Sequence, residues 1–418
     1  MSRAEDTASE PLESHASPSL SPARTRLALL ALALGGFGIG ATEFVAMGLL
    51  PNLAHDLLPA LQAVNPDAAN AQASWLVSAY ALGVVVGAPT IATMAARFPR
   101  KQLLLVLAGA FTLATLASAL LPGFGLVLLA RFVAGLPHGA YFGVASLVAA
   151  SLMGPGRRAR GVAIVLSGLT IANVVGVPAI TLLGQTTNWR VAYLAVAAIF
   201  ALSFVAIALL VPFQSGDAGA TMKRELKAFG RAQVWLALLI GAIGFGGFFA
   251  VYTFISPLVT EVTGLGVHFV PVVLIVVGLG MTVGNLLGGW AADRNIMRSI
   301  FAFFGVFALS LAGMALTSWS VPGLLAFAFM VGASSAALSP AIQTRLMDVA
   351  GDSQTLAAAV NHASLNLGNS LGAFLGGIAI VAGLGYVSPS WVGLLLCVPG
   401  VALAAASVLL ERKRPIRR

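Results

Sequence analysis

Long apolar runs separated by short polar segments make up most of the chain. A helix needs about 20 residues to cross the hydrocarbon core of a bilayer. Twelve runs of that length or slightly longer occur, near 26–50, 72–95, 102–122, 124–152, 160–184, 191–212, 234–258, 268–292, 299–318, 321–348, 355–382 and 389–410. Only 9% of the 418 residues are charged, whereas a soluble domain carries about a quarter. The sequence therefore predicts an all-α integral membrane protein with twelve transmembrane helices, surrounded by the lipid bilayer.

The basic residues test this number of spans. All but two of the 23 Lys and Arg residues lie in the two tails or in the even-numbered loops, and the exceptions are Arg131 and Arg190. Cytoplasmic loops carry such an excess of positive charge, so we predict a multi-pass protein with both termini in the cytoplasm. The net charge is +9, but the basic residues lie in short loops between apolar runs. This placement argues against a nucleic-acid partner.

The two halves of the chain repeat each other at an offset of 196 to 197 residues. The matches are Leu82, Gly83 and Gly87 with Leu279, Gly280 and Gly284; Arg97 with Arg294; Gly135 with Gly332; and Gly168, Ala172, Asn173 and Gly176 with Ser364, Gly368, Asn369 and Gly372. Parallel repeats of six helices are typical of transporters whose two lobes rock around a site near the midplane. We therefore predict a disordered cytoplasmic tail (1–25), a six-helix lobe (26–212), a cytoplasmic linker (213–231), a second six-helix lobe (232–411) and a basic cytoplasmic tail (412–418).

Short motifs make residues 26–411 similar to the major facilitator superfamily. The family's loop motif Gly-x-x-x-Asp-Arg is present from Gly289 to Arg294, and a degenerate copy runs from Ala92 to Lys101. Arg131 and Gly135 match the family's Arg-x-x-x-Gly pattern in the fourth helix. The segments Gly40–Phe44, Gly48–Pro51 and Pro137–Ala140 resemble the drug-proton antiporter branch, near arabinose-efflux and chloramphenicol-exporter proteins.

The resemblance implies a monomeric transporter of the bacterial cytoplasmic (inner) membrane that works by alternating access. It also implies gating roles for Arg97, Arg100, Asp293 and Arg294, which would pair with helix ends and stabilise the outward-open state. The alternative is that these residues only set the topology. The antiporter motif of the fifth helix departs from the usual pattern between Gly176 and Thr181, which leaves the direction of transport open.

Charges inside the membrane are costly and suggest function. Glu43 is the acidic residue that lies well inside a predicted span, and Arg131 is its basic counterpart. Each lies seven residues from the outer end of its helix, about 10 Å deep at 1.5 Å per residue. We predict that the two side chains pair and face the central cavity, where Glu43 would bind and release the coupling proton. The alternative is a static ion pair that joins two helices.

Polar and aromatic side chains within the spans are candidates for substrate contact. His362, Asn366 and Asn369 fall on one face of the eleventh helix, and Asn361 lies beside them. The other candidates are His138, Tyr141, Asn173, Phe245, Tyr252 and Gln343. The alternatives are hydrogen bonds between helices of one lobe and simple core packing. Small residues at Gly168, Ala172 and Gly176, and at Ser364, Gly368, Gly372 and Gly376, would allow close packing, for which the contact between lobes is a candidate place.

These features predict proton-coupled efflux of small molecules, either drugs or sugar-like compounds. Uptake of a small polar solute by proton symport is the alternative, because it would use the same fold and the same acid. A membrane enzyme or sensor has little support, since no catalytic or phosphate-binding motif is recognisable. We therefore expect no enzyme activity, no bound metal and no cofactor, with energy drawn from the proton gradient. Cys397 is the single cysteine, so an intrachain disulfide is impossible.

Overall fold

The computed structural model describes residues 21–95, 98–154, 157–215, 230–350 and 354–413. Over these ranges it contains 12 helices that are long and apolar enough to cross a membrane. They run over Pro22–Gly48, Pro66–Ile91, Arg100–Leu120, Phe124–Met153, Arg160–Thr186, Trp189–Leu210, Ala232–Thr253, Val267–Arg294, Ile296–Thr317, Val321–Ala350, Val360–Leu384 and Ser388–Arg412. Each predicted span is confirmed, with shifts of a few residues at the ends.

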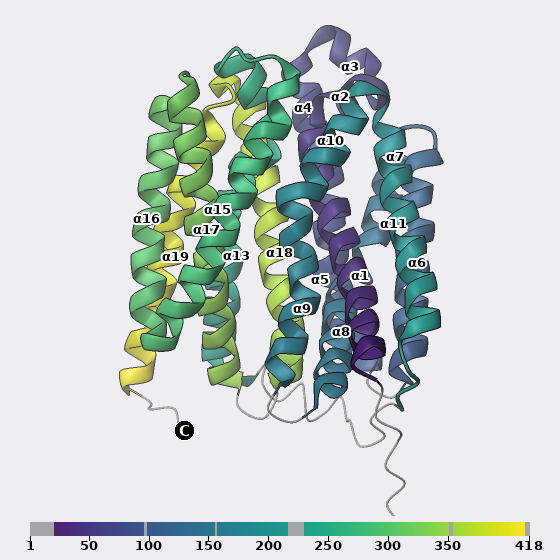
Figure 1. Ribbon diagram of the computed structural model, residues 1–418. Coiled ribbons are helices and arrows are strands. Elements are labelled where there is room, and N and C mark those ends of the chain that lie inside the picture. The colour runs from purple at the N-terminus through teal and green to yellow at the C-terminus, as the bar shows by residue number, and fades with distance from the viewer. Residues whose placement is uncertain (1–20, 96–97, 155–156, 216–229, 351–353, 414–418) are drawn as a thin grey trace, which may run out of the picture.

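The spans pack in two groups (Figure 1). The first lobe comprises α1 (Pro22–Gly48), α5 (Trp75–Ala95), α6 (Arg100–Leu120), α7 (Phe124–Gly135), α8 (His138–Met153), α9 (Arg158–Ile171), η1 (Ala172–Gly176), α10 (Val177–Thr186) and α11 (Trp189–Leu210). The second comprises α13 (Ala232–Thr253), α15 (Val270–Arg294), α16 (Ile296–Thr317), α17 (Val321–Ala350), α18 (Gln354–Ala379) and α19 (Ser388–Lys413). The boundaries of the tails and of the linker stay predictions, because residues 1–20, 216–229 and 414–418 lie outside the described ranges.

The start of α1 and the end of α19 lie at the same end of the helix bundle, which is called the terminal face below (Figure 1). The opposite end, the distal face, carries three short helices between α1 and α5. These are α2 (Leu50–Leu57), α3 (Pro59–Val64) and α4 (Pro66–Ala73). Asp56 of α2 accepts a hydrogen bond from Trp189 Nε1 at 2.9 Å and forms an ion pair with Arg190 at 3.3 Å. These contacts fasten α2 to α11.

Glycines explain the sequence repeat, because they mark matching helix crossings in the two lobes. Gly83 lies against the carbonyl of Phe132 where α5 crosses α7, and Gly280 lies against the carbonyl of Phe329 where α15 crosses α17. A methyl group at either glycine would collide with backbone atoms that cannot move away. The two lobes therefore share one packing solution in which backbones touch directly.

The small residues of the fifth and eleventh spans also allow direct contact between backbones, and they do so within each lobe. Gly168 of α9 lies against the carbonyl of Ala33 in α1, and Gly368 of α18 lies against the carbonyl of Ala242 in α13. The prediction that these two glycines pack at the contact between the lobes is therefore wrong. Both helix pairs belong to a single lobe, where close approach compensates for the missing hydrophobic drive between helices in lipid.

A proline changes the hydrogen-bond pattern in the middle of the fifth span. Pro178 has no N–H to donate to the carbonyl four residues earlier, and its ring crowds that carbonyl. The π-helical segment η1, Ala172–Gly176, ends two residues before this proline and lies between α9 and α10. Such wide turns inside α-helices often occur at functional sites. Here the segment carries Asn173 to the space between the lobes.

Candidate functional site

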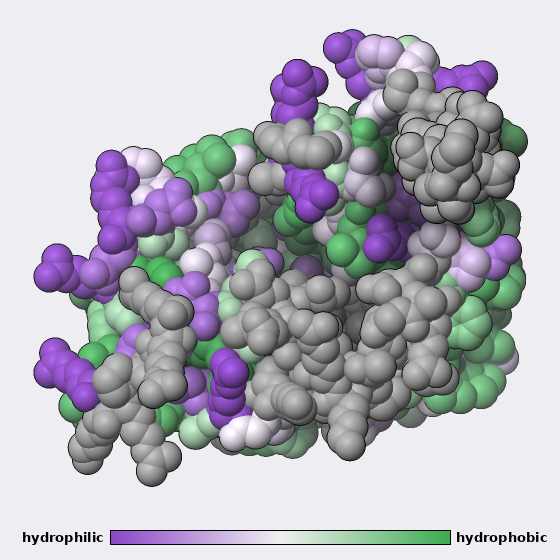
Figure 2. All heavy atoms as spheres, turned by 90° about the horizontal axis from the view of Figure 1, so that it is seen from below, coloured by the Kyte–Doolittle hydropathy of each residue, from purple (hydrophilic) through white to green (hydrophobic). Residues whose placement is uncertain are grey.

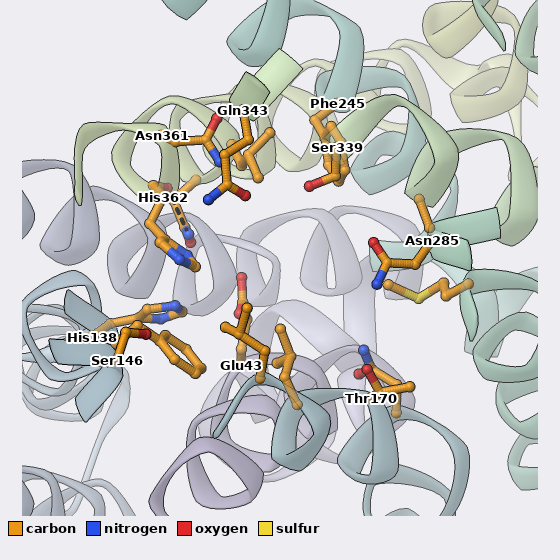
Figure 3. Close-up of a pocket in the computed structure, with 18 of the residues that line it drawn as sticks. Glu43, His138, Ser146, Thr170, Phe245, Asn285, Ser339, Gln343, Asn361 and His362 are labelled. Atoms are coloured by element: carbon orange, nitrogen blue, oxygen red, sulfur yellow. Dashed lines mark hydrogen bonds between the residues drawn. The ribbon is translucent and has the colours of Figure 1, made fainter. Parts of the chain in front are cut away.

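A cavity of about 490 Å³ lies between the two lobes. Its walls come from α1, α8, α9 and η1 in the first lobe and from α13, α15, α17 and α18 in the second. The labelled side chains face each other across this space in Figure 3, with Glu43, His138, Ser146 and Thr170 on one side and Phe245, Asn285, Ser339, Gln343, Asn361 and His362 on the other. The cavity is thus built equally by both halves of the repeat.

The cavity extends toward the terminal face. Its lining includes Ala150, Val162 and Met347, which lie within a few residues of the terminal ends of α8, α9 and α17. Figure 2 looks onto this face and shows a hollow between the lobes with hydrophilic side chains around it. Glu43 lies at the other end of the lining, five residues before the distal end of α1.

Direct contacts between the lobes close the distal side. Asn70 Nδ2 of α4 donates a hydrogen bond of 2.8 Å to the hydroxyl of Tyr386, which lies between the last two spans. Ser78 Oγ of α5 donates to the carbonyl of Ser370 in α18 at 3.4 Å. Burial is the largest cause that raises the pKa of Tyr386 above its ordinary value, and the carboxylates of Asp67 and Glu261 add to it, whereas the hydrogen bond with Asn70 lowers this pKa. The hydroxyl therefore stays protonated at physiological pH.

An aromatic contact closes the space beside Glu43. Phe44 of α1 stacks on Phe249 of α13 with ring centroids 6.0 Å apart, and it meets Tyr252 edge-on at 5.4 Å. These rings join the two lobes between the cavity and the distal face. Water and solutes in the cavity are thereby separated from the distal side.

Glu43 brings the one acidic side chain to the described lining of the cavity. It is 5% exposed. Its Oε1 accepts a hydrogen bond from Nδ2 of Asn369, which belongs to α18 of the other lobe, at 3.3 Å. Within the described ranges, the ion pairs join Arg190 with Asp56 and Arg345 with Glu411. Glu43 therefore faces the cavity with a neutral partner.

The predicted ion pair between Glu43 and Arg131 is wrong. Arg131 is fully buried and is not part of the cavity lining. Its Nη1 donates to Thr42 Oγ1 at 3.1 Å, and its guanidinium lies 4.5 Å from the ring centroid of Tyr80 and 5.5 Å from that of Tyr193. The contact with Thr42 agrees with the predicted depth of Arg131. The side chain turns into the aromatic core of its own lobe, where cation–π contacts hold it.

Seven of the predicted substrate contacts line the cavity. They are His138, Asn173, Phe245, Gln343, Asn361, His362 and Asn366. The His138 and His362 rings lie 5.6 Å apart across the two lobes, and His362 stacks on Phe142 at 5.1 Å. Nδ1 of His138 shares a hydrogen bond of 3.1 Å with the Tyr80 hydroxyl.

Three other predicted contacts lie outside the lining. The hydroxyl of Tyr141 donates to the carbonyl of Leu32 at 2.9 Å, so this side chain fills the core of the first lobe. Tyr252 is covered by Phe44. Asn369 is fully buried, and its side chain turns to Glu43. For these three residues the predicted place in the cavity wall is wrong, because neighbouring side chains cover them.

Five polar residues of the lining were not predicted: Ser146, Thr170, Thr282, Asn285 and Ser339. Their spacing carried a usable signal. Thr282 and Asn285 lie three residues apart, and Ser339 lies four residues before Gln343, so each pair shares a helix face. Such polar faces in otherwise apolar spans indicate a water-filled or substrate-filled space.

Three of the predicted gating residues, Arg100, Asp293 and Arg294, lie at the terminal face. Arg97 is outside the described ranges. The backbone N–H of Arg100 donates to the carbonyl of Gln214 at 3.0 Å, and Asp293 is exposed to solvent. Arg294 lies over the ring of Trp290, 3.5 Å from its centroid. With the cavity extending toward this face, a gating role for these residues stays a prediction.

Arg345 departs from its expected place in a loop. It lies near the terminal end of α17 and is 5% exposed. Its Nη2 donates to Gln233 Oε1 at 3.2 Å and to Ser407 Oγ at 3.0 Å, and it pairs with Glu411 at 3.0 Å. This network joins α13, α17 and α19 within the second lobe.

Comparisons with known proteins agree with this architecture. The model of the Major Facilitator Superfamily matches residues 32–353. The inner membrane transport protein YdhP of Escherichia coli (strain K12) is 38% identical over 387 residues, which cover 93% of this chain and 96% of YdhP. The putative transporter AraJ of the same organism is 33% identical and covers 86% of this chain and 89% of its own length. A chloramphenicol resistance protein of Streptomyces lividans is 31% identical, and the match covers 89% of this chain and 94% of that protein.

A solved structure supports the fold. A crystal structure of a D-xylose-proton symporter superposes with a TM-score of 0.70 at 17% identity, and the match covers 90% of this chain and 97% of that protein. The fold and the relatives are those of transporters and not of enzymes. The chain is a multi-pass membrane protein with twelve spans, and it belongs to the major facilitator superfamily.

Proposed function

We propose that this protein exports small molecules across a bacterial inner membrane in exchange for protons, by alternating access. The observation that carries the proposal is the position of Glu43. It supplies the acidic side chain of the described lining, at the closed end of a cavity that both lobes build. A carboxyl group in such a place can hold a proton while the lobes reorient.

The terminal face corresponds to the cytoplasm in this proposal, as the distribution of Lys and Arg predicts. The cavity would then be open to the inside, ready to take cargo from the cytoplasm. Glu43 would release its proton to this side and take up another when the lobes open distally. Arg131 would hold α1 in place through Thr42, one residue before the acid. The protein would work as a monomer, without a cofactor, driven by the proton gradient.

The lining supports a cargo that is amphipathic. Phe44, Phe142, Phe245 and Phe249 offer aromatic surface, while amides such as Asn285 and Gln343 offer hydrogen bonds. An apolar pocket with a few placed polar groups accepts drug-sized molecules. Drugs and sugar-like compounds both fit this description. The name of the Streptomyces lividans relative makes antibiotics the first compounds to test.

The test is a susceptibility and accumulation screen in cells that carry or lack the gene, with and without a protonophore. We expect lower accumulation of at least one compound in cells with the gene, and loss of the difference with the protonophore. Glu43→Gln should abolish the difference. Glu261→Gln is the matched control, because Glu261 is an exposed acid at the distal side, and it should behave as wild type.

Two results would contradict the proposal. Unchanged accumulation of every compound would remove the export function. Undiminished proton-driven export by Glu43→Gln would remove the acid from the mechanism. Higher accumulation in cells with the gene would instead indicate uptake by proton symport.

A further inference from the structure

Glu43 and Asn369 form a hydrogen bond that crosses from one lobe to the other. Asn369 is fully buried on α18, Glu43 is 5% exposed on α1, and the bond measures 3.3 Å. We propose that this bond is an interlock, which keeps the distal side closed while Glu43 carries neither a proton nor a cargo contact. The inference deepens the proposed function and rests on it, because it assigns Asn369 a positioning role at the same acid.

The strength of the interlock depends on the charge of Glu43. An ionised carboxylate that accepts a hydrogen bond makes a bond roughly twice as strong as a neutral pair does. A carboxylate in an apolar setting also needs its donors, because an unpaired buried charge is costly. The ion pairs of the described residues do not include Glu43, so the amide of Asn369 is a donor that it needs. Protonation of Glu43 removes the charge and weakens the hold.

The position of the bond makes it sensitive to the movement of the lobes. Close by on the distal side lie the aromatic contact of Phe44 with Phe249 and the hydrogen bond of Ser78 to the carbonyl of Ser370. Asn369 is the residue before Ser370 on α18. Opening the distal side would move α18 away from the first lobe, and the amide would leave the carboxylate. The distal-open state therefore loses this bond.

An exchanger must not reorient when it is empty, because an empty crossing wastes the gradient. The interlock would prevent an empty crossing, because either of two events is needed to release it. A proton would neutralise Glu43, and a cargo molecule with a hydrogen-bond donor would compete for the same carboxylate from within the cavity. Either one would release Asn369 and permit the lobes to reorient, whereas the empty, unprotonated carrier would stay closed at the distal side.

Other titratable groups face the same region and must be separated from Glu43 in a test. Arg131 on α7 is bound to the neighbouring Thr42, and Tyr80 on α5 and Tyr252 on α13 lie close enough to Glu43 to interact electrostatically. Arginine stays charged and ordinary tyrosine stays neutral between pH 5 and 8.5. His138 and His362 also line the cavity. A Glu43→Gln variant keeps both histidines, so it isolates the contribution of the acid.

The experiment measures the distance between the lobes at the distal side in the full-length, substrate-free protein. Nitroxides are attached at Val64→Cys and Trp319→Cys, two positions that are 84% and 71% exposed, in a Cys397→Ser background. Pulsed dipolar spectroscopy in lipid nanodiscs gives the share of distal-open molecules at pH 8.5 and pH 5. For the spin-labelled protein that keeps both Glu43 and Asn369, we expect a distal-closed population at pH 8.5 and a larger share of distal-open molecules at pH 5.

Asn369→Leu should raise the open-to-closed ratio at pH 8.5 by about tenfold, which corresponds to the net value of a hydrogen bond to a charged group, and it should flatten the response to pH. Asn369→Ala is the second variant, for the case in which leucine does not fold. It removes the hydrogen-bond donor without adding bulk and should also raise the open share at pH 8.5. Ser364→Ala, which removes a hydrogen bond from α18 to the carbonyl of Leu238 within the second lobe, should leave the distance distribution of the substrate-free protein as in wild type. Glu43→Gln should lose most of the pH response.

Two outcomes would overturn the interlock. One is a wild-type distance distribution for the folded Asn369 variants at pH 8.5. The other is an equal shift for Ser364→Ala. The readout involves no transport, so failure of the interlock is distinguishable from failure of the export function, which the accumulation screen tests separately.

Discussion

The hydrogen bond between Asn70 and Tyr386 can be tested as a latch on the distal side. Tyr386→Phe keeps the ring and removes the hydroxyl that accepts the 2.8 Å hydrogen bond. Asn70 is 6% exposed and Tyr386 is 8% exposed, so water cannot easily replace the lost partner while the lobes stay closed. When the distal side opens, water solvates Asn70 in either protein. The substitution therefore penalises the closed state alone.

The magnitude follows from the burial of the two groups. The net value of such a hydrogen bond is about 1 kcal/mol, and an unsatisfied buried donor raises the cost to about 2 kcal/mol. A change of that size multiplies the open-to-closed ratio by about five to thirty. The effect is large enough to measure, yet small against the stability of the whole fold.

The assay uses a cysteine that only the open state exposes. Ala71 of α4 is 3% exposed and lies against Gly377 of α18. Ala71→Cys in a Cys397→Ser background should react with a membrane-impermeant maleimide at a rate proportional to the open fraction. We expect Tyr386→Phe to raise this rate by about five- to thirtyfold.

A matched control removes a tyrosine hydroxyl that takes no part in the contact between lobes. Tyr193 lies in the first lobe, and its hydroxyl has no hydrogen-bond partner among the described residues. Tyr193→Phe should leave the labelling rate unchanged. An unchanged rate in Tyr386→Phe, or an equal rise in both variants, would refute the latch.

Three further outcomes are expected. Arg131→Lys should lower the melting temperature in detergent, because lysine cannot keep both aromatic contacts of the guanidinium, and a melting temperature equal to wild type would contradict the role of Arg131 in the core. Gly284→Val should reduce the yield of folded protein on size-exclusion chromatography, since the new side chain would collide with the carbonyl of Ala333. Gly289→Ala meets open space and should elute as wild type. The raised pKa of Tyr386 means that the closed state favours the protonated hydroxyl. Its contribution is therefore present below the ordinary phenol pKa of about 10 and lost only at higher pH, so the ratio of labelling rates between wild type and Tyr386→Phe should stay constant from pH 7 to pH 9.

The span count was predictable because hydropathy acts along the chain. Each lipid-crossing helix must be apolar over its own length, and the basic residues mark the loops of one side. The matches between Gly83 and Gly280 were likewise visible, since direct contact of backbones permits no larger residue. Which helices meet at these glycines was not predictable, because the sequence does not say which face of a helix turns to which neighbour.

The depth of the site residues in the membrane was predictable from the sequence, but the direction in which each side chain points was not. Glu43 lies in the cavity as predicted, because an acid in an apolar span has few tolerable places. Arg131 lies at the predicted depth beside Thr42, yet it turns into the tyrosines of its own lobe. Both positions are compatible with the same sequence spacing. The rotation of α7 and the competition between a carboxylate and aromatic rings decide between them, and both depend on tertiary packing.

The glycine crossings also have a mechanical consequence. Where Gly83 meets Phe132 and Gly280 meets Phe329, backbone rests on backbone with no side chain between them. No flexible side chain lies at such a crossing to absorb a movement, so each lobe moves as a rigid body. A small displacement at one end of a lobe therefore arrives at the other end undiminished. Larger residues at these crossings would make the lobes deformable, and movement at the cavity would no longer be transmitted in full to the distal side.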